Sequence, residues 1–180
     1  MRRLVDADRL RRLMRALGKE ARTEGRAYLT GGASAVLLGW RESTIDVDLK
    51  IEPEQDEVLR AIPELKERLE VNVELASPGD FIPELPGWRD RSPFIAREGN
   101  LFFHHYDFYG QTLSKLERRH VRDIDDVMQM YARGLIDPTR LLDLFAAIEP
   151  QLYRYPAIDP RSFRNVVNEM AARLGGSPCR

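Results

Sequence analysis

Cysteine is almost absent from this sequence of 180 residues, since the only one is Cys179, next to the last residue. A single thiol forms no intramolecular disulfide and builds no multi-cysteine zinc cage. Histidine is also scarce, with three in all. His104 and His105 are adjacent on a predicted strand and so face opposite ways, which prevents them from chelating one metal ion together. His120 lies among arginines, and we interpret all three histidines as structural or substrate-adjacent.

Long apolar runs are missing too. No stretch approaches the roughly 18 to 20 apolar residues of a membrane-spanning helix, and the amino terminus turns acidic at Asp6 before any apolar stretch develops. We therefore expect a cytoplasmic protein without a membrane partner. Apolar residues make up 43% and charged residues 32% of the chain, as in ordinary globular proteins. The net charge of -1 supplies no global field for binding nucleic acid, so any such role depends on local basic clusters.

The pattern of apolar residues predicts an α/β (α+β) fold, with a small mixed sheet flanked by helices and a helical region after it. Strands are expected at residues 27–30, 45–51 and 71–76, and a hairpin at 94–97 and 101–107. Helices are expected at residues 6–24, 33–40, 54–69, 137–148 and 161–174, and the pattern is helical from Tyr109 onward, with 113–131 considered as one helix. The helix at 137–148 has a predicted N-cap in Asp137, followed by proline at its first position.

Two aspartates on the strand at 45–51 are the strongest chemical signal. Asp46 and Asp48 are two residues apart, so they project from one face with roots about 6 to 7 Å apart, while Ile45, Val47 and Leu49 take the other face. Two like charges side by side favour a hard divalent cation bound through oxygen, Mg²⁺ or Mn²⁺. The alternative interpretation is a solvated sheet face.

A glycine pair precedes this strand. Gly31 and Gly32, followed by Ala33 and Ser34, lie between a predicted strand and a predicted helix, where glycine lets the backbone approach a phosphate and the helix start offers free N–H groups. Arg41 is a further candidate phosphate contact. Taken with Asp46-Val47-Asp48, this arrangement resembles the polymerase-beta-type nucleotidyltransferase superfamily. The resemblance implies that the Gly-Gly turn and Ser34 hold the triphosphate and that the two aspartates bind metal.

A second stretch narrows the resemblance. The run Gln111 to Arg118, followed by Arg122-Asp123-Ile124-Asp125-Asp126, is similar to the helical motifs of the AbiEii and MenT group of toxin nucleotidyltransferases. The resemblance implies that Lys115 contacts the nucleotide phosphates and that Asp123 is needed for activity, with Asp126 as the second aspartate. It also implies a catalytic core at residues 1–108 and a C-terminal helical region at 109–180 that completes the active site.

The helix expected at 113–131 would carry Lys115, Arg119, Arg122 and Asp126 on one polar stripe. An ordinary amphipathic helix with favourable charge pairs is the alternative. For a third carboxylate we favour Glu74, because its strand alternates in the same sense as the Asp46 strand, with Val71, Val73 and Leu75 inward. Asp107 is the competing choice.

The hypothesis is therefore a metal-dependent nucleotidyltransferase that transfers a nucleoside monophosphate from a nucleoside triphosphate to an acceptor. The toxin relatives imply the 3′ end of tRNA as acceptor and a cognate antitoxin protein as partner. Transfer of AMP to a protein side chain is one alternative, and a catalytically silent nucleotide-binding or antitoxin-binding module is another.

Overall fold

The computed structural model describes residues 4–175. The chain divides into two compact units. Unit 1 takes the chain up to Ser77 together with Ser92–Tyr106, and unit 2 takes Pro78–Arg91 together with the chain from Asp107 onward. The sequence placed one boundary at 108/109 and did not separate the segment at 78–91. No helix among the described residues has the length and apolar character needed to cross a lipid bilayer.

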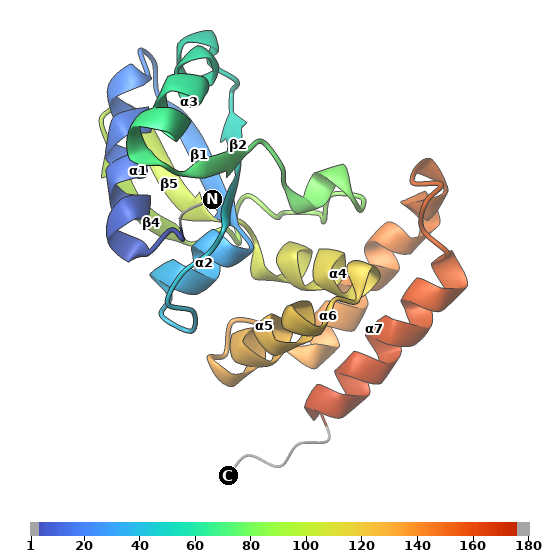
Figure 1. The fold of residues 1–180 in the computed structure, drawn as a ribbon. Helices are drawn as coiled ribbons and strands as arrows, with labels where there is room; N and C mark the ends of the chain where they lie inside the picture. Colours follow the sequence, from blue (N-terminus) through green and yellow to red (C-terminus); the bar gives the residue numbers. More distant parts are fainter. Residues whose placement is uncertain (1–3, 176–180) are drawn as a thin grey trace. The chain divides into compact units, whose positions relative to one another are not determined.

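Unit 1 is built on a mixed five-stranded sheet (Figure 1). Its strands are β1 (Gly25–Thr30), β2 (Asp46–Glu52), β3 (Asn72–Glu74), β4 (Phe94–Glu98) and β5 (Leu101–His105). They lie in the order β3-β2-β1-β5-β4. Strand β1 runs parallel to β5 and antiparallel to β2, β2 runs parallel to β3, and β4 and β5 form the predicted hairpin. The predicted α/β (α+β) fold is confirmed.

Three helices belong to unit 1: α1 (Ala7–Glu20), α2 (Gly32–Leu37) and α3 (Asp56–Leu69). Helix α1 begins where the side chain of Asp6 accepts a hydrogen bond from Arg9 N at 2.9 Å, a standard N-cap. Its apolar stripe contacts α3, β4 and β5. Gly18 of α1 lies directly against the backbone of Glu98, with no room for a Cβ. The core of unit 1 therefore lies between these helices and one face of the sheet.

The two strands for which alternation was predicted follow it, except at their ends. In β2, Val47, Leu49 and Ile51 are buried, and the charged residues between them are partly exposed. Ile45 was predicted to point inward, but it is 42% exposed because the strand begins at Asp46, after it. Leu75, also predicted inward, is 57% exposed because β3 ends at Glu74. Neither residue has a paired strand position that would hold it against the core.

Unit 2 is helical in its described part (Figure 1). It contains the short 3₁₀ segments η1 (Pro78–Asp80) and η2 (Glu149–Arg154), and the helices α4 (Phe108–Arg118), α5 (Val121–Ala132), α6 (Pro138–Ile148) and α7 (Pro160–Gly175). Helix α4 contacts α5, α6 and α7. The predicted N-cap Asp137 is confirmed, since its carboxylate accepts a hydrogen bond from Arg140 N at 2.8 Å.

The chain is helical after Tyr109 as predicted, but residues 113–131 do not form the one helix on which the polar stripe depended. Helix α4 ends at Arg118, and Arg119 takes a left-handed conformation with φ of 60° before α5 starts at Val121. A left-handed residue at this position is a common way to end a helix, although usually it is glycine. The guanidinium of Arg119 donates hydrogen bonds to the carbonyl and hydroxyl oxygens of Ser162 in α7. That tertiary contact holds the turn, and the predicted polar stripe through Arg119 does not exist as one helical face.

Candidate active site

Asp46 and Asp48 lie on the face of β2 that points away from the core of unit 1. Both side chains are partly exposed, and Val47 between them is fully buried. Two residues along a strand separate their Cα atoms by about 6 to 7 Å. The predicted strand and its alternation are confirmed, so the two carboxylates share one face.

Strand β3 brings two more polar side chains to the same face. In the parallel register, Asn72 is opposite Asp46, and Glu74 is opposite Asp48. The Asn72 amide nitrogen donates to Asp46 Oδ1 at 2.6 Å and to Glu74 Oε1 at 3.1 Å. A neutral amide thereby holds two carboxylates without neutralising either. Sequence reasoning did not select Asn72; its alternation with Glu74 was the available signal, but the register with β2 was not.

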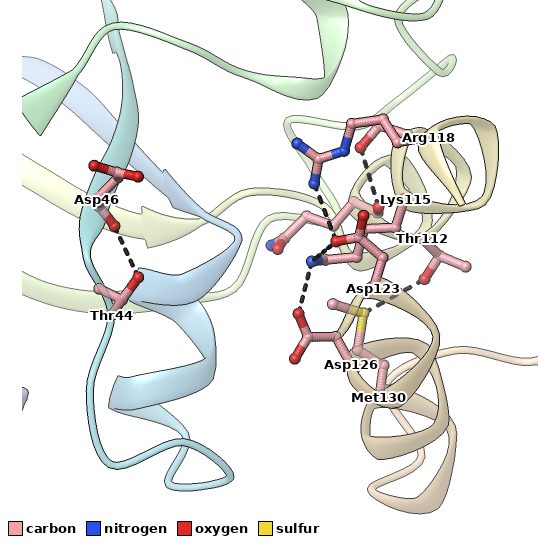
Figure 2. A network of polar contacts seen from close by, with 10 residues as sticks. Thr44, Asp46, Thr112, Lys115, Arg118, Asp123, Asp126 and Met130 are labelled. Atoms are coloured by element: carbon pink, nitrogen blue, oxygen red, sulfur yellow. Dashed lines mark hydrogen bonds and ion pairs between the residues drawn. The ribbon is translucent and has the colours of Figure 1, made fainter. Parts of the chain in front are cut away.

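The Gly31-Gly32 turn lies against the start of β2. Gly31 has φ of 58°, and a Cβ there would lie 3.3 Å from Asp48 Oδ2. A Cβ on Gly32 would come within 2.1 Å of Thr44 Oγ1. The Thr44 hydroxyl in turn donates to the Asp46 carbonyl oxygen at 3.0 Å (Figure 2). Glycine suits Gly31 because of its positive φ and Gly32 because of its close packing on Thr44, and the result is backbone beside the Asp48 carboxylate.

Ser34, predicted to contact phosphate, is fully buried at the first turns of α2. Its hydroxyl donates to the Leu29 carbonyl oxygen at 3.1 Å and lies 3.0 Å from His105 Nδ1. Since the single hydroxyl proton goes to Leu29, Nδ1 of His105 carries the proton of the second bond. Burial, and then the charge of His104, lower the pKa of His105 to about 4. The Ser34 hydroxyl is thus bonded within the interior of unit 1, and its predicted phosphate contact stays a prediction.

The other two residues predicted for the site, Arg41 and Asp107, differ in burial and in the unit to which they belong. Arg41 is half-buried in the segment between α2 and β2. Asp107, the competing third carboxylate, is 1% exposed and belongs to unit 2. Arg91 donates two hydrogen bonds of 3.2 and 2.7 Å to the Asp107 carboxylate, which also accepts a hydrogen bond from Tyr109 N at the start of α4. Asp107 is therefore engaged as a helix cap and ion-pair partner, whereas Glu74 is in register with Asp48.

Unit 2 contains a separate buried cluster of charges around Lys115 (Figure 2). Lys115 Nζ on α4 donates to Asp123 Oδ1 at 3.0 Å and to Asp126 Oδ2 at 2.7 Å, both on α5. The three residues are 4%, 5% and 1% exposed. Arg118 adds a bond of 3.1 Å to the same Asp123 oxygen, while Asp123 Oδ2 has no hydrogen-bond partner among the described residues. The turn at Arg119 makes the cluster, because it folds α5 back onto α4.

This arrangement differs from the exposed stripe that the sequence suggested. Lys115 is buried between two carboxylates, and Arg122 is exposed. Two cations face two anions in the cluster, so it is neutral overall. A contact between Lys115 and a phosphate would require Nζ to exchange a carboxylate for a phosphate oxygen. That role stays a prediction.

The donor set on β2 and β3 fits Mg²⁺ or Mn²⁺ in chemical type. Among residues 4–175, no three His, Cys, Asp or Glu side chains already converge on a single metal position. Mg²⁺ does not need such a cage, because it usually keeps several waters and binds one or two carboxylates together with substrate phosphates. Asp46 and Asp48 supply two carboxylates on one partly exposed face beside a backbone turn. They are the residues that would hold the ion.

Comparison of the sequence with models of known protein families gives a match to a family of nucleotidyltransferases. A family model described as "Nucleotidyltransferase of unknown function (DUF6036)" matches residues 3–172. The chain belongs to this family. The match supports nucleotidyl transfer in general and spans both units, and it does not extend to the AbiEii and MenT group. No curated protein and no solved structure matches the chain.

Proposed function

We propose that this member of the nucleotidyltransferase family transfers a nucleoside monophosphate from a nucleoside triphosphate to an acceptor hydroxyl, with Mg²⁺ or Mn²⁺ bound by Asp46 and Asp48. The observation that supports the proposal most is the position of the Asp48 carboxylate. It shares a face with Asp46, is in register with Glu74, and lies against the Gly31 backbone. Cation ligands and phosphate-approaching backbone are thus neighbours within unit 1.

The reaction requires one bond to form and one to break. The acceptor oxygen bonds to the α-phosphorus, the bond from that phosphorus to the bridging oxygen of the β-phosphate breaks, and pyrophosphate leaves. When bound, the divalent ion neutralises phosphate charge and lowers the pKa of the attacking hydroxyl. Positioning and charge neutralisation account for most catalysis of this type. The protein contributes carboxylates held on a rigid strand and a turn that phosphate oxygens can approach.

Glu74 has two roles open to it in this proposal. It either completes the cation site or accepts the proton of the acceptor hydroxyl. Its carboxylate is exposed, and the Asn72 amide bridges it to Asp46. Lys115 and Asp123 of unit 2 are proposed as a second element needed for activity, with Lys115 as a phosphate contact. Arg41 of unit 1 is proposed as a further phosphate contact. Substitution of each residue tests its role separately from the two aspartates.

The test incubates the protein with each α-labelled nucleoside triphosphate, Mg²⁺, and either total cell RNA or a protein lysate. Asp48→Asn removes one anionic ligand and keeps the side-chain shape. We expect the rate of labelling to fall at least about a hundredfold, since metal stabilisation of phosphoryl charge is worth several kcal/mol. The matched control is Glu64→Gln, which removes an exposed carboxylate that pairs with Arg68 one helical turn away. We expect that control to label at the wild-type rate.

The labelled product identifies the acceptor. Label at the 3′ end of tRNA would support the acceptor that the toxin resemblance implies, and label on a protein band would support transfer of AMP to protein. Unchanged labelling in Asp48→Asn would overturn the proposed mechanism. Absence of label with every nucleotide and both acceptor pools would favour the alternative of a catalytically silent binding module. A nucleotide-binding measurement would then test that alternative.

A further inference from the structure

A row of rings crosses the sheet of unit 1 on the same face as Asp48. Phe94 of β4, His104 of β5 and Tyr28 of β1 occupy successive register positions. The Phe94 ring meets the His104 ring edge-on at 5.6 Å between centroids, and the His104 ring lies 5.5 Å from the Tyr28 ring. Tyr28 is buried, His104 is half-buried, and Phe94 is 59% exposed. We call Phe94 and His104 the ring shelf.

A hydrogen bond to the backbone determines which ring nitrogen of His104 can accept a hydrogen bond from a ligand. Its Nδ1 lies 3.0 Å from the Ser92 carbonyl oxygen. A carbonyl oxygen can only accept, so the neutral imidazole carries its proton on Nδ1 and has a lone pair on Nε2. Within residues 4–175, Nε2 has no hydrogen-bond partner. The shelf therefore offers an aromatic surface together with one acceptor of fixed direction.

Positive charge borders the shelf. Arg26 of β1 is exposed and forms no ion pair with any other described residue. Arg97 of β4 lies over the Phe102 ring at 4.7 Å and pairs with Glu24 at 3.4 Å. Aromatic rings with guanidinium groups nearby are a combination that stacks flat heteroaromatic bases. An exposed phenylalanine alone would need no explanation, but these features together do.

The shelf also lies within reach of the proposed cation site. Tyr28 is opposite Lys50 on β2, and Thr30 is opposite Asp48, so the ring row is one register step from Asp48. One such step is about 7 Å, and the two strand spacings from β5 to β2 add about 10 Å at right angles, which puts the Cα atoms of His104 and Asp48 about 12 Å apart. Side chains on one face of a sheet stand roughly parallel, so a ligand that bridges His104 and Asp48 has to cover a distance of that order, as a nucleoside with its phosphates does.

We propose that Phe94 and His104 bind the base of the donor nucleoside triphosphate, by stacking on the rings and by a base N–H group that donates to His104 Nε2. The inference rests on the proposed function, because it takes the phosphates to lie at Asp46 and Asp48. The donor is preferred to the acceptor strand because a single nucleoside with its phosphates covers that distance. Stacking tolerates every base, so affinity for the four nucleoside triphosphates should differ little.

The experiment compares two ligands by calorimetry, an α,β-methylene nucleoside triphosphate and inorganic tripolyphosphate, each with Mg²⁺. Both have a phosphate chain, but only the first has a base. Phe94→Ala should weaken nucleotide binding about tenfold, because stacking one base is worth a few kcal/mol at most, and leave tripolyphosphate binding unchanged. Phe94→Tyr should bind the nucleotide like wild type. Phe81→Ala, which removes a phenylalanine of unit 2 that is 44% exposed, is the matched control and should bind both ligands normally.

Three results would overturn the assignment: nucleotide affinity unchanged in Phe94→Ala, equal loss of affinity for both ligands, or an effect confined to the KM of a nucleic acid acceptor. The last result would assign the shelf to the acceptor strand. The proposed function is tested separately by Asp48→Asn. If that variant loses labelling while Phe94→Ala binds nucleotide normally, the nucleotidyltransferase proposal stands and the ring shelf fails.

Discussion

Lys115→Met should destabilise unit 2 strongly, whatever its effect on activity. The substitution keeps a long apolar stem and removes the ammonium group that lies 3.0 and 2.7 Å from Asp123 and Asp126. Both carboxylates are at most 5% exposed, so water cannot replace the lost donor. Removal of one partner from a buried ion pair costs about 3 to 5 kcal/mol, chiefly because the remaining charge stays buried. Arg118 still pairs with Asp123, which favours the lower end of that range.

The two tryptophans of the chain make the measurement specific, because Trp40 belongs to unit 1 and Trp88 to unit 2. Trp88 is 2% exposed, so in a Trp40→Phe background its fluorescence in urea follows the unfolding of unit 2. The double variant Lys115→Met with Asp126→Leu removes a complete charge pair. It should recover most of the lost free energy of unfolding, because an apolar pair of similar volume replaces two buried charges.

A loss below about 1 kcal/mol in Lys115→Met would refute this reasoning, since that is the value of an exposed pair. Failure of the double variant to recover would show that the cost came from packing and not from charge. A double variant that is stable but inactive in the labelling assay would separate a chemical role of Lys115 from its structural one. Restored activity would contradict the predicted phosphate contact.

Two further predictions concern unit 1. Asn72→Ala removes the amide that positions Asp46, so the Mg²⁺ concentration needed for half-maximal labelling should rise about 10-fold to 100-fold. Binding of Mn²⁺ in a spectroscopic titration should weaken in parallel. An unchanged Mg²⁺ requirement would show that the hydrogen bond from Asn72 to Asp46 does not affect the cation site. His105 has a pKa of about 4 when folded against an ordinary 6.5, so its stabilising contribution is complete above pH 6.5 and is lost as the pH falls towards 4, by up to about 3 kcal/mol. Urea unfolding of His105→Gln should accordingly depend less on pH between 4 and 6.5 than that of wild type, and equal slopes would contradict the burial argument.

Local patterns were sufficient for the parts of the candidate site that lie within a few residues of one another. The period-two alternation around Val47 is a property of any half-buried strand, so it put Asp46 and Asp48 on one face without knowledge of the rest. The glycine pair between a strand and a helix could be recognised because it, too, is a pattern of consecutive residues. Asp137 was found because a helix cap depends on three or four consecutive residues.

Contacts between distant segments were beyond such patterns. Asn72 lies beside Asp46 through the register of two strands that are 26 residues apart in sequence. At the helix break, Arg119 is hydrogen-bonded to Ser162, which is 43 residues away. A period of 3.6 residues continues equally well through a straight helix and through two helices joined by a turn, so periodicity could not reveal it. The burial of Lys115 follows from that turn.

The sequence by itself determined which way the two aspartates point and that the fold mixes a small sheet with helices, because side-chain direction and amphipathic period are local consequences of backbone geometry. Only the tertiary structure decided what those side chains meet. Strand register put Glu74 beside Asp48, and the close approach of Gly31 to β2 supplied the neighbouring backbone. Register and packing depend on the free energy of burying the whole core, which no short stretch of sequence contains.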